Sequence, residues 1–319
     1  MADLVSLGEL LIDFTPCGES ERGNPLFERN PGGGPANMAC AAAKLGTDTA
    51  FIGQVGDDVF GHVLRDVLIQ NHVDTGRLRL SHEYQTTLAF VHLTPEGDRS
   101  FSFYRRQGAD TMLDAEPEDF ALIDGCRCFF YSAVLMTGGP SRQASFDLAA
   151  HARSRHILTV FDPNLRLNLW SSGEEAKRCI LHAMHWADVV KVSEEELIFL
   201  TGGKDMETAG RMLMEAYGMK LLLVTLGAEG CCALRGDTWM TVPPCPADTI
   251  DTTGAGDAFT GGFLTRLLES HADPAELTDA QLMDMLRFAN AVGALTTAKR
   301  GGIPALPERD AVEAALTAL

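Results

Sequence analysis

Short apolar segments with the length of β-strands alternate with longer segments of helical periodicity along most of this chain of 319 residues. Strands are predicted at residues 4–7, 49–55, 127–133, 157–161, 188–192 and 220–226, and helices at residues 38–45, 60–72, 141–153, 173–186, 205–217, 279–299 and 308–318. Such alternation is typical of an α/β fold, because a helix brings the chain back to start a parallel strand. We therefore predict a single domain over residues 1–319, with a mostly parallel central sheet and helices on both faces.

One part of the chain interrupts this alternation. Two extended segments, 86–94 and 99–105, flank the turn sequence Pro95-Glu-Gly-Asp98, which is the pattern of a β-hairpin. Residues 14–31 are rich in proline, glycine and charge. We expect segments 14–31 and 86–106 to form a small β-sheet lid that is inserted in the domain and covers its ligand pocket.

The apolar side chains of the predicted hairpin favour contact with a second copy of the chain. Val91, Leu93, Phe101 and Phe103 make it more apolar than a two-stranded ribbon in water should be. A half-open sheet also has strand edges that need cover. The pattern predicts a homodimer in which the two lids are in contact.

The composition argues against several classes of protein. A net charge of −18 argues against nucleic acid as a partner, because phosphate neutralisation dominates affinity there. No segment approaches the roughly 18 apolar residues of a membrane span, and the first residues lack the basic start of a signal peptide. The eight cysteines include no C-x-x-C pair and are interpreted as reduced core residues. We expect a cytoplasmic protein with no membrane partner.

The segment Asp251-Thr-Thr-Gly-Ala-Gly-Asp-Ala-Phe259 leads from an irregular stretch into a helix with buried periodicity. Small residues at 254–256 allow a ligand close to the backbone, and the N–H groups of a first helical turn are free. With the positive end of the helix dipole they form an anion site. Asp257 within it is either a base that takes a proton from the attacking group or a residue that stabilises the helix start. Its pKa is expected to be low in both cases.

Further polar residues follow predicted strands, at the edge where open α/β sheets bind ligands. They are Asp13 and the segments 162–166, 193–196 and 225–230. Ser193 and Glu196 also fit a helix capping box, and the two interpretations are compatible. The sequence contains no P-loop, no dinucleotide fingerprint after a strand and no recognisable nucleophile signature. Residues 254–256 are therefore the candidate phosphate site.

Two motifs, Gly32-Gly-Gly-Pro-Ala-Asn37 and the segment 251–259, resemble the two signatures of the ribokinase-like (PfkB) carbohydrate kinases. The resemblance covers nearly the whole chain, and segments 103–106, 162–166 and 191–196 are most similar to those of the bacterial fructokinases of that family. It implies a ribokinase-like fold and ATP-dependent phosphorylation of a hydroxyl of a small sugar, fructose before others.

The resemblance also implies roles for individual residues. It makes Asp257 the base that takes the proton of the sugar hydroxyl, and it places Arg166 near the phosphates or the substrate. The backbone of Gly254, Ala255 and Gly256 would stabilise charge on the transferred phosphoryl group. Sugar contacts are expected from Asp13, Gly33, Gly34, Asn37, Phe103 and Arg106.

The nucleotide and the ions have their own implied residues. The nucleotide is expected to meet Lys191, Ser193, Glu196, Thr225, Gly227, Gly230 and Asn290. The Asn-x-x-Glu motif that the family associates with magnesium is Ser193-x-x-Glu196 here, so Glu196 is expected to reach Mg²⁺ through water. Asp251 and Thr253 match a monovalent-cation site for K⁺, which the loop 299–303 would complete.

Other activities stay open at this stage. A kinase for 2-keto-3-deoxygluconate, ribose or a nucleoside would belong to the same family, and Arg105, Arg106 or Arg166 would suit the carboxylate of a keto acid. A sugar-sensing protein without turnover is the alternative from another class. It would be expected to lose the base or the glycines of the anion site, and this chain keeps both.

Overall fold

The computed structural model describes residues 2–93, 99–203 and 205–318. The strands are β1 (Leu4–Leu7), β2 (Leu11–Glu19), β3 (Pro25–Gly32), β4 (Thr49–Gly56), β5 (Val73–Ser81), β6 (Leu88–Leu93), β7 (Arg99–Tyr104), β8 (Cys128–Ser132), β9 (Leu158–Asp162), β10 (Val189–Ser193), β11 (Leu221–Thr225), β12 (Cys231–Arg235) and β13 (Thr238–Val242). The helices are α1 (Gly34–Lys44), α2 (Val59–Gln70), α3 (Pro117–Asp124), α4 (Ser141–Ser154), α5 (Gly173–Ala183), α6 (Glu194–Thr201), α7 (Met206–Tyr217), α8 (Ala255–Ser270), α9 (Asp279–Thr297) and α10 (Arg309–Thr317).

The described residues form a central sheet of nine strands in the order β13-β12-β11-β10-β9-β8-β1-β4-β5. The pairs from β11 through β5 are parallel, and β12 and β13 at one edge pair antiparallel. Strands covered on both faces are expected to be buried and largely apolar, as β1 is with all four residues buried. Its one polar side chain, Ser6, donates to the carbonyl of Pro35 at 3.0 Å. The prediction of an α/β fold with a mostly parallel sheet is confirmed.

Several elements of the structure were not predicted from the sequence. β5 lies at one edge of the sheet, and its sequence Val73-Asp-Thr-Gly-Arg-Leu-Arg-Leu-Ser81 has no continuous apolar run. β12 and β13 form the opposite edge, directly after the loop at 225–230. α3 and α6 have eight residues each, too few for a clear helical period. These elements depend on contacts with the sheet more than on a strong local pattern.

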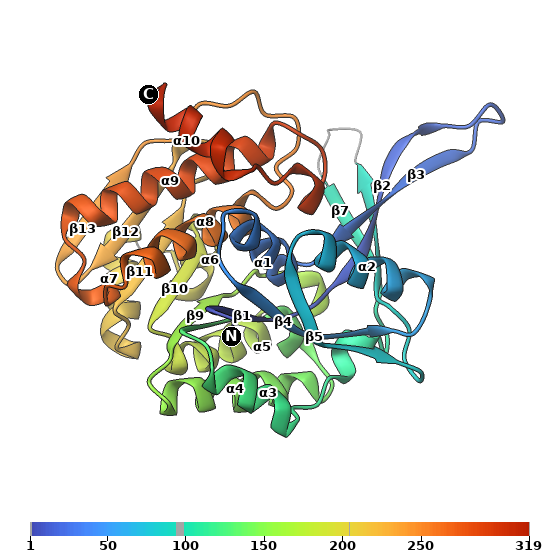
Figure 1. The fold of residues 1–319 in the computed structure, drawn as a ribbon, viewed down its shortest axis with the longest axis horizontal. Coiled ribbons are helices and arrows are strands. Elements are labelled where there is room, and N and C mark those ends of the chain that lie inside the picture. Colours follow the sequence, from blue (N-terminus) through green and yellow to red (C-terminus); the bar gives the residue numbers. More distant parts are fainter. Residues whose placement is uncertain (1, 94–98, 204, 319) are drawn as a thin grey trace.

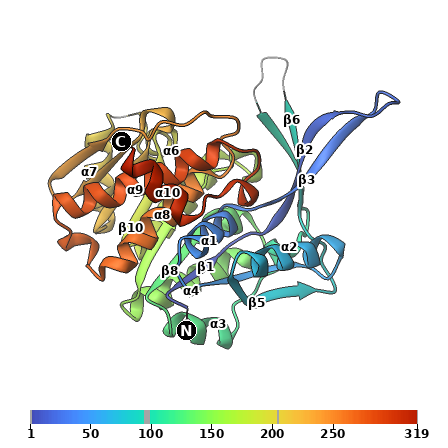
Figure 2. The ribbon, with the colours of Figure 1, turned by 45° about the horizontal axis from the view of Figure 1, so that its top comes forward.

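Helices cover both faces of the central sheet (Figure 1). α1, α8 and α9 pack on one face, where Phe259 and Phe263 of α8 share a buried cluster with Leu4 and Val189. Helices α3 to α7 cover the other face through a second cluster that includes Leu148 and residues of β8 to β11. Turning the molecule shows the small sheet projecting beside this three-layered body (Figure 2).

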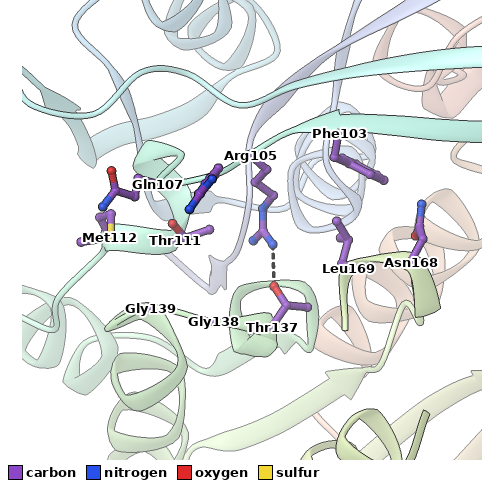
Figure 3. Close-up of a pocket in the computed structure, with 11 residues that line it drawn as sticks. Phe103, Arg105, Gln107, Thr111, Met112, Thr137, Gly138, Gly139, Asn168 and Leu169 are labelled. Carbon is purple, nitrogen blue, oxygen red and sulfur yellow. Dashed lines mark hydrogen bonds between the residues drawn. The ribbon is translucent and has the colours of Figure 1, made fainter. Parts of the chain in front are cut away.

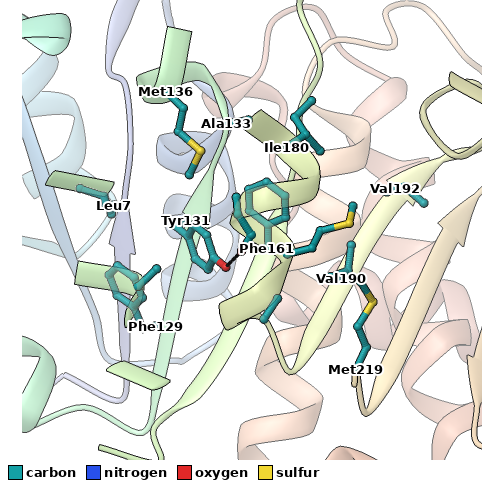
Figure 4. Close-up of a cluster of buried hydrophobic side chains, with 14 of the residues drawn as sticks. Leu7, Phe129, Tyr131, Ala133, Met136, Phe161, Ile180, Val190, Val192 and Met219 are labelled. Atoms are coloured by element: carbon teal, nitrogen blue, oxygen red, sulfur yellow. Dashed lines mark hydrogen bonds between the residues drawn. The ribbon is translucent and has the colours of Figure 1, made fainter. Parts of the chain in front are cut away.

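The centre of the second cluster is built from aromatic rings on adjacent strands (Figure 4). The ring of Tyr131 lies 5.8 Å from that of Phe129 and 4.8 Å from that of Phe161, measured between centroids. The buried hydroxyl of Tyr131 donates a hydrogen bond to the carbonyl of Ala183 at 2.7 Å, so burial leaves no unpaired polar group there. This packing fixes the strands whose ends carry the candidate site.

The small sheet is separate from the central one and has the order β3-β2-β6-β7. β2 continues from β1 after a short connection, so the two sheets meet at the first strand (Figure 1). The predicted segments 14–31 and 86–106 fall largely on these four strands, and a small separate sheet is confirmed. The turn at 95–98 and the side chains of Leu93 and Phe101 lie outside the described residues.

Two observations concern the membrane span and the disulfide framework that the composition argued against. Within the described residues, no helix combines the length and apolar character needed to cross a membrane. All eight cysteines are free, and seven of them are buried, whereas Cys17 on β2 is exposed.

Candidate active site

The order of the strands reverses at β1, because the chain continues to β4 and β5 on one side and to β8 and its successors on the other. Open α/β sheets bind ligands beyond the carboxyl ends of their strands at such a point. A cavity of about 280 Å³, which we call the central cavity, lies there. It is lined by Glu9, Leu11, Asp13, Gly33, Gly34, Asn37, Phe103, Val134, Asn164, Arg166, Leu169, Thr252, Thr253, Gly254 and Asp257.

Asp257 lies in the first turn of α8, after a left-handed turn at Gly254 with φ 76°. The next eight residues of α8 are all buried, so the core anchors the helix with its N-terminus at the cavity. The Nδ2 atom of Asn37 donates to Oδ2 of Asp257 at 2.8 Å, and that of Asn164 donates to Oδ1 at 3.2 Å. Since neither donor belongs to α8, the contacts favour a site residue over one that only stabilises the helix start.

The pKa of Asp257 is raised above its ordinary value, so the expectation of a low pKa was wrong. Burial of the carboxylate is the largest cause, and Glu196 also raises the pKa. The hydrogen bond from Asn37 and the positive charges of Lys191 and Arg166 lower it by less. The prediction considered only the helix dipole, whose effect is smaller than the cost of removing a carboxylate from water. A raised pKa makes this carboxylate a better proton acceptor.

The glycine turn before α1 forms another wall of the cavity. Gly33 is the N-cap residue of α1 with φ 115°, and a Cβ atom there would lie 2.3 Å from the carbonyl oxygen of Glu9. The N–H of Gly34 donates to Oε1 of Glu9 at 2.9 Å. The turn therefore needs glycine for both its conformation and its space, and it brings Asn37, one helical turn later, to Asp257.

Asp13 lies on β2, near the point where the chain enters the small sheet. Burial raises the pKa of Asp13 to about 7, and the positive charge of Arg166 acts against that rise. A carboxyl group with this pKa can accept or donate a hydrogen bond near neutral pH. Asp13 and Asp257 line the same cavity, so a bound polyol could form hydrogen bonds with both carboxyl groups.

Glu9 is a site residue that the sequence analysis did not assign. It is 3% exposed, and its Oε2 atom has no hydrogen-bond partner within the described part of the chain. Burial raises its pKa from 4.5 to about 7, against the lowering effects of the N–H groups of Glu9 and Gly34 and of the charge of Arg105. Its position after the first strand, in Gly8-Glu9, was the available signal.

Glu9→Gln is expected to remove part of the pH dependence of stability. The folded protein keeps a proton on Glu9 between pH 4.5 and about 7, where the unfolded chain releases it. The contribution of protonated Glu9 to the free energy of unfolding is therefore fully present below pH 4.5 and is lost as the pH rises through about 7. The total loss is at most about 3 kcal/mol. Urea unfolding of both proteins from pH 4.5 to 8 measures this, and parallel curves would contradict it.

A buried ion pair lies beneath the start of α8. Nζ of Lys191 on β10 is 3.1 Å from Oδ2 of Asp162 at the end of β9, and the two side chains are 8% and 2% exposed. Burial acts to lower the pKa of Lys191, but the carboxylates of Asp162, Glu196 and Asp257 together raise it. A Cβ atom on Gly256 would lie 3.1 Å from this Nζ atom. A positive charge is thus held under the predicted anion site.

Ser193 and Glu196 form the predicted capping box at the start of α6. Oε2 of Glu196 accepts from the N–H of Ser193 at 2.8 Å, and Oε1 accepts from the N–H of Leu165 at 2.6 Å. Each oxygen keeps a lone pair for a water molecule. The described residues contain no group of three or more His, Cys, Asp or Glu side chains that would ligate a metal. The free lone pairs of Glu196 suit a contact with Mg²⁺ through water, and that contact stays a prediction.

The other predicted nucleotide residues follow β11 or lie on α9. Thr225 ends β11 and pairs in register with Ser193 on β10. Gly227 and Gly230 have φ 58° and 96° and shape the turn after it. Asn290 of α9 donates its amide to the carbonyl of Pro243 at 2.8 Å, so this donor holds a loop in the structure. Nucleotide contacts of these residues stay a prediction.

The structure brings the loop 299–303 to Asp251, as expected. Oδ2 of Asp251 accepts from the N–H of Gly301 at 3.0 Å, and Oδ1 accepts from the N–H and hydroxyl of Thr253 at 2.9 and 2.7 Å. These bonds tie the loop to the turn that precedes α8. Whether a cation binds there stays a prediction.

Arg106 lines a neighbouring cavity of about 470 Å³ and does not line the central one. Arg105 and Thr137 also line this neighbouring cavity (Figure 3). Phe103 lines both cavities. Arg105, beside it, donates from Nε to Oδ2 of Asp110 at 2.7 Å and also to the hydroxyl of Thr137 and the carbonyl of Val134. The guanidinium of Arg105 is thus paired with Asp110, and each of its three nitrogen atoms donates a hydrogen bond.

The structure gathers Asp13, Gly33, Gly34, Asn37, Phe103, Arg166, Gly254 and Asp257 around one cavity. Sequence reasoning did not assign Glu9 or Asn164 to it, although both follow strands and Asn164 lies in the segment 162–166 that it singled out. It also gave no role to Asp162 and its ion pair. The signal was a polar residue at a strand end, which does not show which cavity that residue lines.

Comparisons with known proteins cover almost the whole chain. A family model described as pfkB family carbohydrate kinase matches residues 1–309. Fructokinase-1 of Zea mays is 44% identical over 307 residues, which are 95% of this chain and 94% of the maize protein.

The solved structures that resemble this chain include fructokinases as well. A Xylella fastidiosa fructokinase with bound ATP matches with a TM-score of 0.91 and 31% identity, over 100% of this chain and 99% of that one. A double mutant of a Vibrio cholerae fructokinase, in a form with fructose, ADP and potassium bound, matches with a TM-score of 0.86 and 33% identity, over 99% and 98%.

The central sheet, the separate small sheet and these structural neighbours define a ribokinase-like fold. The family match extends over both motifs that suggested the resemblance. The chain belongs to the pfkB family of carbohydrate kinases.

Proposed function

We propose that this chain is an ATP-dependent fructokinase, which transfers the terminal phosphoryl group of ATP to a hydroxyl of fructose. The main support for fructose as the phosphoryl acceptor is the 44% identity to a maize fructokinase over nearly the whole length of both chains. The bound ATP of the Xylella neighbour and the bound fructose and ADP of the Vibrio neighbour support the two substrates.

The central cavity supplies the parts that such a reaction needs. Asp13, the Gly33–Gly34 turn and Asn37 hold hydroxyls of the sugar, and Asp257 takes the proton of the attacking hydroxyl as its oxygen bonds to phosphorus. The N–H groups at 254–256, of which that of Ala255 also donates to the carbonyl of Thr252 at 3.3 Å, stabilise the charge on the phosphoryl group together with Lys191 and Arg166. The small sheet closes over the cavity as a lid and excludes water.

A neutral sugar suits the described site better than a keto acid. Of the three arginines considered for a carboxylate, Arg105 is paired with Asp110, and Arg106 lies in the neighbouring cavity. Arg166 stays at the central cavity, where its charge lowers the pKa of both Asp13 and Asp257. These contacts favour fructose over 2-keto-3-deoxygluconate.

Magnesium enters with the nucleotide in this proposal. Glu196 would hold it through water, and the ion would neutralise phosphate charge during transfer. Lys191, Ser193, Thr225, Gly227, Gly230 and Asn290 would serve the nucleotide itself. The cytoplasmic location stays as predicted from composition.

An assay of ATP-dependent ADP release with fructose, ribose, 2-keto-3-deoxygluconate, glucose and nucleosides tests the proposed function. The expected result is the highest kcat/KM with fructose. A higher value with any other acceptor would replace fructose, and no ADP release with any of them would favour the sensor alternative.

K⁺ is expected to raise activity through a site at Asp251 and Thr253. A cation there would steady the turn that carries the anion site, as the loop 299–303 already meets Asp251. Rates in potassium and in a large organic cation at equal ionic strength measure the effect. Asp251→Ala should abolish the difference between the two, and equal rates in the parent protein would contradict the prediction.

We also propose a homodimer in which the lids are in contact. Leu26, Phe27 and Tyr104 on the small sheet are 44%, 39% and 69% exposed, and Phe27 packs edge-on against Phe90 at 5.8 Å between ring centroids. Phe27→Asp is expected to give a monomer by light scattering at micromolar concentration, because a charge would be buried at the contact. Val59→Asp, at an apolar residue 69% exposed on α2, should stay dimeric. A monomeric parent would contradict the proposal.

A further inference from the structure

We propose that Asn164 is a positioning residue that fixes the carboxylate of Asp257 for proton transfer, an inference that rests on the proposed function. Asn164 follows β9, lines the central cavity and donates from Nδ2 to Oδ1 of Asp257 at 3.2 Å. Asn37 of α1 holds the other carboxylate oxygen at 2.8 Å. Two amides from different elements therefore hold the carboxylate by both of its oxygens.

The backbone of Asn164 is in the left-handed region, with φ 44°. That conformation is unfavourable for residues other than glycine, although asparagine tolerates it better than most. Its N–H donates to Oδ1 of Asp162 at 3.0 Å, and Oδ2 of Asp162 pairs with the buried Lys191. The ion pair thus holds the turn that directs the amide of Asn164 to Asp257. A glycine would adopt this backbone conformation more easily, but it has no side-chain amide that could donate to Asp257.

Gly34 leaves the space that the amide of Asn164 occupies. A Cβ atom on Gly34 would lie 1.9 Å from Nδ2 of Asn164 and 3.1 Å from Oδ1 of Asp257. The glycine turn, the segment after β9 and the first turn of α8 therefore converge on one carboxylate oxygen. This convergence explains why both a glycine at 34 and a strained asparagine at 164 stand in this chain.

The hydrogen bond has two consequences for proton transfer. It limits rotation of the carboxylate, and displacement of a reacting group by about 1 Å can cost about 10²-fold in rate. It also favours the charged form of Asp257, and so acts to lower its pKa. Loss of the bond should therefore slow turnover and move the acid limb of the kcat–pH profile to higher pH.

Asn164→Gly tests this inference because glycine accepts the backbone conformation and removes only the amide. We expect kcat to fall about 10- to 100-fold, with the acid limb moved to higher pH. KM for fructose and for ATP should stay within about threefold, and the urea midpoint should not fall. A lower urea midpoint with an unmoved acid limb would mean a structural role only and would overturn the inference. So would kcat within about twofold of the parent with an unmoved limb.

His156→Gly is the matched control. His156 is an exposed residue with φ 57°, outside the central cavity, so the same replacement relieves the backbone there without touching Asp257. It should keep the parent kcat. Asn164→Asp should move the acid limb further upward than the glycine variant, because two carboxylates would then share the site; a downward movement would contradict this.

The design separates this inference from the proposed function. A parent protein that does not phosphorylate fructose would refute the fructokinase proposal. The same variants, measured with the sugar that the parent does accept, would still test Asn164.

Discussion

Asp257→Asn is expected to lower kcat by about 10²–10⁴-fold, the usual contribution of a general base. Asparagine keeps the size of the side chain but cannot accept the proton of the sugar hydroxyl. The affinities for fructose and ATP should change by only a few-fold, because the proposed function assigns the sugar mainly to other residues of the central cavity and the nucleotide to residues outside it. Steady-state kinetics with both substrates, on protein shown to be folded by circular dichroism, measure the effect.

Two further variants separate the base from a helix-start residue. Asp257→Ala should be about as slow as Asp257→Asn. Asp205→Ala removes an aspartate that caps α7 by accepting from the N–H of Thr208, and should cost about 0.5–2 kcal/mol of stability while kcat stays unchanged. If Asp257→Asn behaved like Asp205→Ala, with lower stability and kcat within a few-fold of the parent, Asp257 would be only a helix-start residue.

Gly33→Ala is expected to cost about 2–5 kcal/mol of stability and to raise the KM for the sugar. The left-handed backbone contributes about 1–2 kcal/mol of that cost. The contact of the new Cβ with the carbonyl of Glu9, at 2.3 Å without relaxation, contributes about 1–3 kcal/mol, as overpacking does elsewhere. Relief of that contact would move the turn and Asn37, which line the central cavity and to which the proposed function assigns the sugar. Urea unfolding and acceptor kinetics measure both effects.

Gly18→Ala is the matched control for that prediction. Gly18 has the same φ of 115°, but a Cβ atom there would meet no atom within 4 Å. It should therefore show only the backbone cost of about 1–2 kcal/mol, with an unchanged KM. Equal losses of stability in the two variants would show that the space beside Glu9 is not limiting.

Local patterns in the sequence were enough to predict most of the fold. The strands of the centre of the sheet are mostly apolar, and the helices between them keep a clear period, so the alternation itself indicated a mostly parallel sheet. The edge strands β5 and β13 were missed, because a strand with one partner needs less apolar surface and leaves a weaker pattern. β12, which pairs with β11 and β13, was missed as well, although its first four residues are buried.

The candidate site also combines features that local sequence patterns predict with contacts that only the tertiary structure creates. Glycines that must adopt φ above zero, and an aspartate after them at a helix start, are local features, and the sequence by itself determined the two turns at Gly33 and Gly254. The meeting of Asn37 with Asp257 spans 220 positions, and that of Asn164 with Asp257 spans 93. Only the register of the strands and the packing of α1 against α8 bring them together.

The pKa of Asp257 shows most directly why the sequence alone could not predict the properties of the site. The helix dipole is a local property, so the sequence suggested a lowered pKa, whereas the tertiary structure raises it. Desolvation depends on every atom that surrounds the carboxylate, and those atoms come from segments far apart in the chain. The sequence by itself determined which group carries the charge. Only the tertiary structure decided how much water that group loses and which amides hold it.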